Sequence, residues 1–109
     1  LLQTVTGFSE NKYAVMEPKD ILYLEAGIEG LLSFTNTKAY SMKETLQYYE
    51  ALWTEKGFLR VNKSQLVNLY HVKEIVPWFN SRYVLKMNNG HELEVSKIYA
   101  KKLRSLLKI

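Results

Sequence analysis

The sequence predicts a mainly β protein that folds as a single domain. Along most of the chain, short apolar segments alternate with turn residues, which is typical of a meander of antiparallel strands. The composition includes eight Tyr, four Phe and two Trp, and aromatic residues favour strands. Only two segments repeat apolar residues at helical spacing, one in mid-chain and one at the C-terminus. A chain of 109 residues is long enough for one core but not for two domains.

The first nine residues carry the weakest pattern. Residues 1–9 are expected to be a linker remnant or a weak strand near 2–6, and residues 10–109 are expected to form the single domain. The chain begins with Leu rather than Met, so we expect it to be part of a longer protein.

Four further strands are expected before the mid-chain helix, at residues 12–16, 21–26, 31–35 and 38–42. Pro18 suits the first position of a helical turn between the first two of them. Gly27 and Gly30 bound a loop before the third strand and permit the chain to reverse there.

Residues 42–54 are expected to form an amphipathic helix. Ser41 and Glu44 have the spacing of a capping box at its start. Apolar residues then recur at helical spacing, at Leu46, Tyr49, Leu52 and Trp53. This stripe predicts a helix that packs its apolar side on the core.

The central stretch, residues 58–68, reads Phe-Leu-Arg-Val-Asn-Lys-Ser-Gln-Leu-Val-Asn. Alternation over residues 58–62 predicts a strand. Ser64 then suits the cap of a tight turn or short helix that apolar residues hold to the core. The junction at Asn62 and Lys63 is polar and basic, and it leaves the packed region. Two interpretations stay open: a rigid mount that presents a cation to a ligand, or an ordinary loop.

The last third is predicted to contain three strands and a closing helix. The strands are expected at residues 71–76, 81–87 and 91–95. Pro77 ends the first of them, and residues 78–80 form a loop. Asn88-Asn89-Gly90 predicts a type I′ hairpin turn between the other two. Ser96 suits the N-cap of the closing helix, which is basic outside and carries on its inner face Tyr99, Leu103, Leu106 and Leu107.

The charge is divided unevenly along the chain. Residues 1–54 carry a net charge of −3 and residues 55–109 carry +7, which gives the whole chain +4. A basic half is expected of a protein with an anionic partner, although small domains also reach this charge by chance. The chain has no cysteine, so disulfides and thiol chemistry are excluded. No apolar run approaches the roughly 18 residues of a membrane span.

Motifs for catalysis or metal binding are missing from the sequence. His71 and His91 lie in different predicted strands, and no His, Cys or carboxylate spacing marks a metal site. Nothing matches a nucleophile motif or a phosphate-binding glycine loop. We therefore expect no enzyme activity, no metal site and no cofactor.

Four segments, in this order, resemble the LytTR domain, the DNA-binding output domain of many bacterial response regulators. They are Asp-Ile-Leu-Tyr-Leu-Glu-Ala at 20–26, the helix segment Thr45-Leu46, the central stretch, and Asn89-Gly90 running into Val-Ser-Lys-Ile-Tyr at 95–99. The likeness covers about residues 12–107, and the spacing R-x-x-[KR]-S-x-x-V-N in the central stretch is its most specific part. It implies a layered antiparallel β-sandwich of short strands with short helices at its edge.

The resemblance also implies a function. Domains similar to this one bind double-stranded DNA sequence-specifically and regulate transcription, two domains on a direct repeat. Their loops enter successive major grooves, and a third contact lies over the minor groove between them. The chain is therefore expected to be the output domain of a two-component response regulator in the cytoplasm, with a receiver domain upstream and no membrane contact.

Carried over motif by motif, the resemblance places three loops on DNA. The expected DNA-binding residues are Glu29, Gly30 and Leu31 in the first loop (27–31), Asn62 and Lys63 in the second, Lys97 and Ile98 in the third (96–98), and Lys101 and Arg104 on phosphates. Arg60 either points to DNA along its strand or braces the fold by pairing with Glu25 or another acid, and both options stay open. The first loop and Ile98 depart from the polar or basic residues of many family members, and there Leu31 or Ile98 would touch a thymine methyl group.

The alternative function is a protein-interaction module on the same fold that has lost DNA binding. Leu31 and Ile98, together with an exposed Trp78 and Phe79, would form its apolar partner surface.

Overall fold

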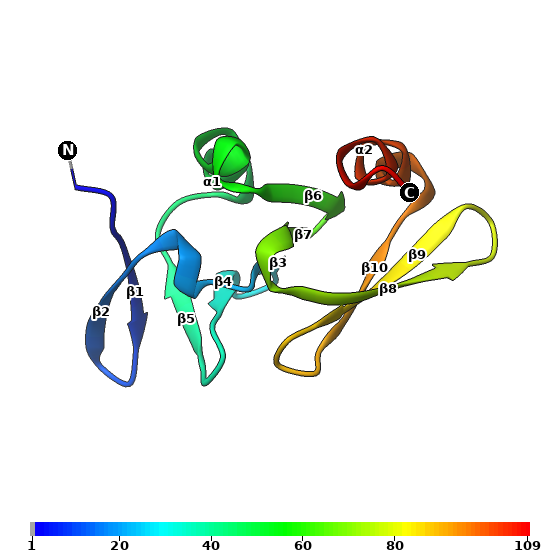
Figure 1. Ribbon diagram of the computed structural model, residues 1–109. Coiled ribbons are helices and arrows are strands. Elements are labelled where there is room, and N and C mark those ends of the chain that lie inside the picture. The colour runs from blue at the N-terminus through cyan, green and yellow to red at the C-terminus, as the bar shows by residue number, and fades with distance from the viewer. Residues whose placement is uncertain (1) are drawn as a thin grey trace.

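The structure is a computed structural model that describes residues 2–109 and is built mainly of short antiparallel strands (Figure 1). The strands are β1 Val5–Ser9, β2 Lys12–Met16, β3 Tyr23–Gly27, β4 Gly30–Phe34, β5 Ala39–Met42, β6 Phe58–Asn62, β7 Gln65–Asn68, β8 Val72–Trp78, β9 Arg82–Met87 and β10 Glu92–Val95. The helices are α1 Leu46–Trp53 and α2 Lys97–Leu107, with short 3₁₀ turns η1 Pro18–Asp20, η2 Thr54–Lys56 and η3 Leu69–His71. The mainly β fold class, with one mid-chain and one C-terminal helix, is confirmed.

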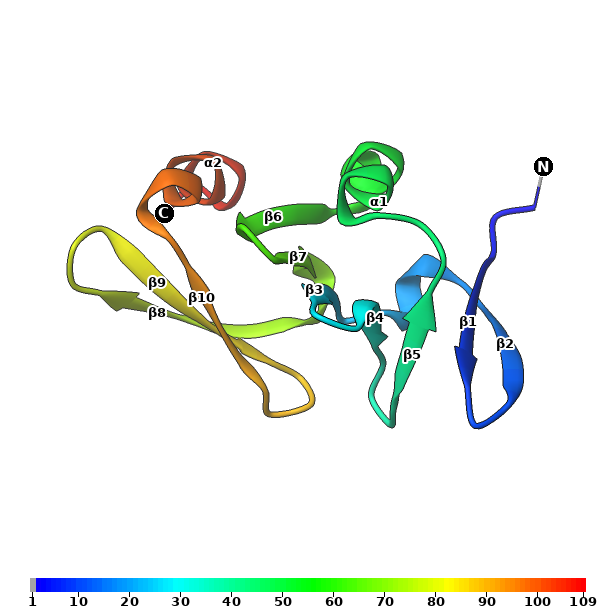
Figure 2. The same cartoon turned by 180° about the vertical axis from the view of Figure 1, so that it is seen from behind.

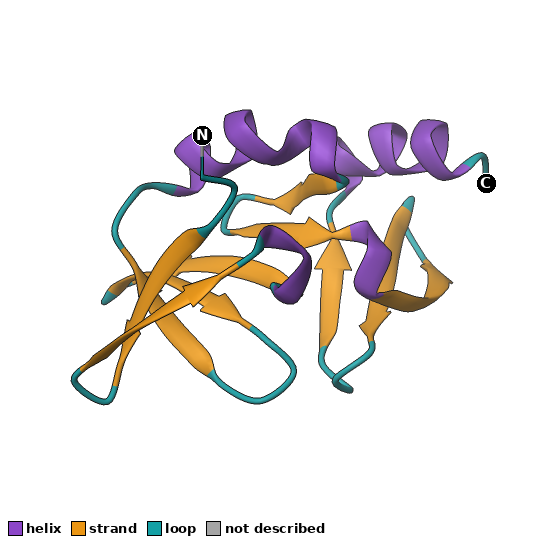
Figure 3. Ribbon diagram, turned by 60° about the vertical axis from the view of Figure 1, so that its left-hand side comes forward, coloured by secondary structure: helices purple, strands orange, loops and turns teal. Residues whose placement is uncertain are grey.

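The strands form two sheets that meet at the centre of the molecule. The larger sheet has the order β2-β1-β5-β4-β3-β7-β6, and the smaller one has the order β10-β9-β8. Every strand pair in both sheets is antiparallel. Both helices lie on the same side of the strands (Figure 1), and Figure 3 shows them end to end across that side.

The central strands β3, β7 and β6 are buried on both faces. Leu24, Leu66 and Phe58 point into a cluster beneath α1. Their neighbours along the same strands point into a second cluster, beneath α2 and the smaller sheet; they are Tyr23, Val67, Leu59 and Val61. A strand between two cores reads as a nearly continuous apolar run. Both layers of the sandwich therefore share these three strands.

Tyr23 joins the two sheets. Its Oη is hydrogen-bonded to His91 Nδ1 at 2.8 Å, and its ring stacks on Phe34 with the centroids 4.5 Å apart. Burial, and then the charge of Glu25, raise the pKa of Tyr23 to about 12, so the phenol stays neutral at physiological pH. The contact ties the turn between β9 and β10 to β3.

The first strand is stronger than the sequence indicated. Residues 1–9 were expected to be a linker remnant or a weak strand near 2–6, but β1 pairs with β2 along its whole length and with β5 at Phe8. Leu1 lies outside the described residues. Gly7 permits this packing, because an added Cβ would lie 2.6 Å from Tyr40 Cβ. Because Gly7 has no side chain, β1 and β5 can lie side by side. No apolar pattern in the sequence reveals this requirement.

Two expectations about helices are wrong. The mid-chain helix begins at Leu46 after Thr45, whose side chain accepts a hydrogen bond from the Tyr48 amide. Ser41 belongs to β5, so the Ser41 capping box does not form. The segment after Ser64 is the strand β7 rather than a turn or short helix, because pairing with both β3 and β6 outweighs its local capping signal.

Two turns also differ from the expectation. Strand β8 continues through Pro77 to Trp78, which is possible because β8 is an edge strand and needs no amide there. The turn at 88–90 is not type I′, since only Gly90 has a positive φ, 90°. Two consecutive positive φ values occur instead at Glu10-Asn11 and Asn80-Ser81, as type I′ turns require.

The helices of residues 2–109 include none with the length and apolar character to cross a membrane.

Asn68 is buried at the end of β7 and satisfies two backbone groups. Its Nδ2 donates to Ile21 O at 3.0 Å, and its Oδ1 accepts from Tyr70 N at 3.1 Å. Asn68→Ala is expected to lower the free energy of unfolding by about 2 to 3 kcal/mol, because both partners lose a hydrogen bond. Urea unfolding followed by tryptophan fluorescence measures this loss. The control Asn36→Ala, in the exposed turn between β4 and β5, is expected to cost about 0.5 kcal/mol or less; equal losses would contradict the role of Asn68.

Candidate nucleic-acid interface

The turn between β6 and β7 is held by the side chain of Asn62. Its Oδ1 accepts from the Ser64 amide at 2.9 Å, and its Nδ2 donates to Gln65 Oε1 at 2.7 Å and to Glu94 O at 2.9 Å. Both protons of Nδ2 are thus used within the protein. Asn62 was expected to contact DNA, but its amide is engaged in shaping the turn and in tying it to β10.

Arg60 braces the same turn from the other side. Its guanidinium donates to Asn62 O at 3.0 Å through Nε, to Lys63 O at 2.8 Å through Nη2, and to Glu50 Oε1 at 2.6 Å through Nη1. The Arg60 side chain is only 14% exposed. Of the two options for this residue, the structure therefore shows the brace, and its acidic partner is Glu50 on α1. Glu25 instead accepts from Gln65 Nε2 at 2.7 Å.

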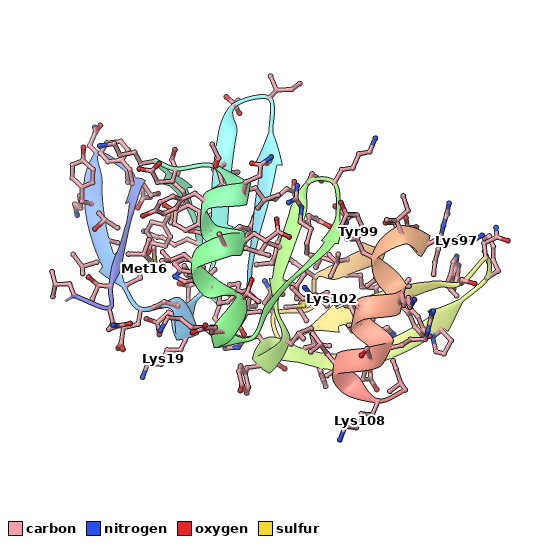
Figure 4. All side chains as sticks on the ribbon, turned by 90° about the horizontal axis from the view of Figure 1, so that it is seen from above. Met16, Lys19, Lys97, Tyr99, Lys102 and Lys108 are labelled. Atoms are coloured by element: carbon pink, nitrogen blue, oxygen red, sulfur yellow. The ribbon has the colours of Figure 1, made fainter. Side chains whose placement is uncertain are left out.

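Backbone hydrogen bonds fix the first loop to this central turn and the third loop to strand β6, which leads into the turn. Ala26 N, at the end of β3, donates to Ser64 O at 2.8 Å, and Ser96 N, before α2, donates to Val61 O at 3.0 Å. The three segments come from residues far apart in the sequence, and the turn between β6 and β7 connects the other two. Figure 2 shows all three on the side that faces the viewer, and Figure 4 shows them in a row.

This row presents two cations to solvent. Lys63 is exposed in the turn between β6 and β7, and Lys97 is exposed at the first position of α2. Figure 4 shows Lys97 at the edge of the molecule where this row lies, with Lys19 and Lys108 at the opposite edge. The structure therefore brings Lys63 and Lys97 to one side of the molecule, where a single anionic ligand can meet both.

The first loop differs from the expectation in its apolar residue. Glu29, in the turn between β3 and β4, and Gly30, the first residue of β4, are exposed, but Leu31 is 6% exposed and packs in the cluster beneath α1. The expectation that Leu31 is a surface residue is wrong, because β4 begins at Gly30 and directs Leu31 inward. Ile28 is the exposed apolar side chain of the first loop, and Ile98 is the exposed apolar side chain of the third loop.

Lys101 and Arg104 lie farther from the row. They follow Lys97 on one face of α2, since residues four and seven positions apart share a helical face. The helix runs away from this edge (Figure 4), so Arg104 lies about 10 Å along the axis from Lys97. Lys101 is exposed and Arg104 is half-buried.

A hollow of about 370 Å³ lies between the first and second loops. Lys43 and Gln47, both exposed, contribute to its rim together with Lys63. Neither residue was expected at the interface. The sequence carries no signal for them, since Lys43 precedes α1 and meets the row only through the pairing of β4 with β5.

Comparison with known proteins identifies the family. The family model of the LytTr DNA-binding domain matches residues 11–108 of the sequence. The chain belongs to this family. The resemblance that the sequence motifs indicated is thereby confirmed, and the family is defined by DNA binding rather than by catalysis.

Relatives of the LytTr family match nearly the whole chain. It is 39% identical over 97 residues to the sensory transduction protein LytT of Bacillus subtilis, covering 87% of this chain and 39% of the relative. It is 29% identical to the transcriptional regulatory protein YpdB of Escherichia coli O6:H1, covering 95% of this chain and 43% of the relative. The chain thus spans about two fifths of these curated relatives. A solved LytTr DNA-binding domain from Bacillus cereus superposes with a TM-score of 0.92 and 29% identity, covering 100% of both chains.

Asn62→Ala is expected to loosen the central turn without unfolding the protein. The Ser64 amide loses its acceptor, and the bond to Glu94 O near the third loop is lost. A local loss of about 1.4 kcal/mol corresponds to about tenfold faster amide exchange. Hydrogen exchange by NMR at Ser64 and Ser96 measures it. The matched control is Asn88→Ala, an exposed residue of the turn between β9 and β10; unchanged exchange at Ser64 in the Asn62 variant would contradict this account.

Proposed function

We propose that this LytTr domain binds double-stranded DNA sequence-specifically to regulate transcription, reading the major groove through its loops. The observation that carries the proposal is the row of three hydrogen-bonded segments that exposes Lys63 and Lys97 on one edge. Cationic side chains on a pre-formed edge suit phosphates and guanine edges, which are the acceptors that lysine meets on DNA. The curated relatives include proteins named for sensory transduction and transcriptional regulation.

Each side chain of the row has its own role in this proposal. Lys63 and Lys97 contact phosphate or guanine, and Lys101 and Arg104 add phosphate contacts along α2. Arg60 and Asn62 act as positioning residues, because their polar atoms hold the turn that carries Lys63. Ile28 and Ile98, both exposed, suit the methyl group of thymine. Glu29 is the one acidic group of the first loop and disfavours close approach of a phosphate there.

The proposal extends to the whole regulator. The chain spans about two fifths of its curated relatives, which leaves room in a similar protein for a further domain. We propose a receiver domain upstream, whose state controls how two output domains occupy a direct repeat in the cytoplasm.

Selection from a random pool of duplexes tests binding and specificity together. We expect one enriched sequence. If the domain neutralises about three to five phosphates, the logarithm of its affinity for that duplex falls with the logarithm of salt concentration at a slope of about −3 to −5. Titrations by fluorescence anisotropy at several salt concentrations measure the slope. A flat salt response, or no enrichment after repeated rounds, would contradict the proposal.

Lys63→Ala and Lys97→Ala are each expected to weaken binding to the selected duplex by about fivefold to twentyfold and to reduce the magnitude of the salt slope by about 1. The fold is unaffected, because both side chains are exposed. Circular dichroism checks the fold, and anisotropy measures the affinity.

The matched control for these variants is Lys19→Ala. Lys19 lies at the opposite edge in Figure 4, and its ion pair with Glu17 is long, 3.9 Å, and exposed, so its loss changes stability little. The control is expected to bind DNA as the wild type does. Equal weakening in all three variants would indicate non-specific attraction instead of a defined edge. Undiminished binding by the double Lys63 and Lys97 variant would contradict the assigned contacts.

A further inference from the structure

The tip of the hairpin between β8 and β9 carries two exposed aromatic rings. Trp78 is 49% and Phe79 is 64% exposed, and their ring centroids lie 5.4 Å apart. The turn that follows has positive φ at both Asn80 and Ser81, so its shape is fixed locally. Two adjacent apolar rings exposed to solvent form an apolar surface that a partner can cover. The three loops of the proposed interface do not include them.

The pairing of the strands places this tip next to the third loop. Strand β9 pairs with β10 only as far as Tyr83 and Val95. Arg82 and the turn therefore extend beyond the end of β10, past the point where Ser96 starts the third loop. Figure 4 shows the tip beside Lys97, where it continues the row formed by the other three segments.

Positive charge accompanies the rings. Arg82 pairs across the hairpin with Trp78. Its ion pair with Glu94 is 3.9 Å long, with both side chains about half exposed, and such a pair holds the guanidinium weakly. Lys97 and Lys101 are exposed on the neighbouring start of α2. Cations beside apolar rings complement a nucleic-acid backbone, which offers phosphates next to the apolar faces of its sugars.

We propose that this hairpin tip is a fourth DNA contact, which binds the duplex just outside the segment that the three loops meet. Trp78 and Phe79 pack against the sugars at the edge of the groove, and Arg82 contacts a phosphate. The proposal rests on the proposed function, because it extends the same row by one element. Its support is charge complementarity to DNA and continuity with the third loop.

Duplexes of two lengths test the proposal. One carries only the selected site, and the other adds about five base pairs on the side next to the third loop. We expect the wild type to bind the longer duplex about tenfold more tightly, which corresponds to one well-packed aromatic contact. The double variant Trp78→Ala and Phe79→Ala is expected to lose this gain and to bind the short duplex as the wild type does.

The matched control is a second exposed aromatic pair, Phe8 and Tyr13, whose ring centroids lie 4.9 Å apart on the hairpin formed by β1 and β2. That hairpin lies at the far end of the molecule from β8 and β9 (Figure 1). The variant Phe8→Ala and Tyr13→Ala is expected to keep the full gain from the longer duplex. Loss of the gain in this control as well would overturn the assignment to the tip.

Tryptophan fluorescence gives a second readout that needs no destabilising variant. Trp53 is 2% exposed and Trp78 is 49% exposed, so acrylamide quenches chiefly Trp78 in the wild type. The longer duplex is expected to protect Trp78, and the short duplex to leave it quenchable. Trp78→Phe removes the quenchable component and serves as the reference.

The outcomes separate this proposal from the function on which it rests. Absence of binding to either duplex by the wild type overturns both. Tight, salt-dependent binding that is equal for the two lengths, with Trp78 unprotected, overturns the fourth contact alone. The fourth contact is also overturned if raising the protein concentration without DNA protects Trp78 from acrylamide quenching. In that case a second copy of the chain, and not DNA, covers the hairpin tip.

Discussion

The fully engaged amide of Asn62 is the constraint on which the rest of the candidate interface depends. This one side chain shapes the turn between β6 and β7 and reaches the backbone of β10. Arg60 completes the arrangement by holding two carbonyl oxygens of the turn and anchoring them to Glu50 on α1. At a partly buried site, a set of hydrogen bonds that satisfies every polar group favours one geometry, because alternatives break several of these bonds together. Lys63 therefore extends from a turn that is ordered before any ligand arrives.

The same turn explains how three separate loops become one surface. Ala26 N donates a backbone hydrogen bond to Ser64 O in the turn, and Ser96 N donates one to Val61 O in strand β6, which leads into the turn. Contacts with residues distant in the sequence therefore help to position both flanking loops. This leaves the exposed side chains of those loops free to vary without disturbing the frame. Ile28, Glu29 and Ile98 are of this kind, whereas Arg60 and Asn62 are not. Residues at the interface thus divide into those that hold the frame and those that face the solvent.

The sequence predicted the strands wherever periodicity was undisturbed, and it failed where tertiary pairing decides. The segment after Ser64 has a local capping signal, but β3 and β6 on either side draw it into the sheet as β7. Pro77 normally ends a strand, yet at a sheet edge the missing amide costs nothing. The cations of the row could be predicted from the family motif, whereas the burial of Leu31 and the place of Lys43 depend on the register of β4 with its neighbours. Hydrogen bonds between residues about 30 to 40 positions apart, such as Asn62 with Glu94 and Gln65 with Glu25, leave no trace in a local pattern.

The double-sided burial of β3, β6 and β7 has a thermodynamic consequence. Alternate residues of each of these strands pack in different clusters, so loss of either cluster leaves the three shared strands supported on one face only. Melting of the helix α2 would expose one face of the strands on whose other face α1 rests. The molecule is therefore expected to unfold as one cooperative unit, and stability added anywhere in either cluster is shared by both ends of the chain.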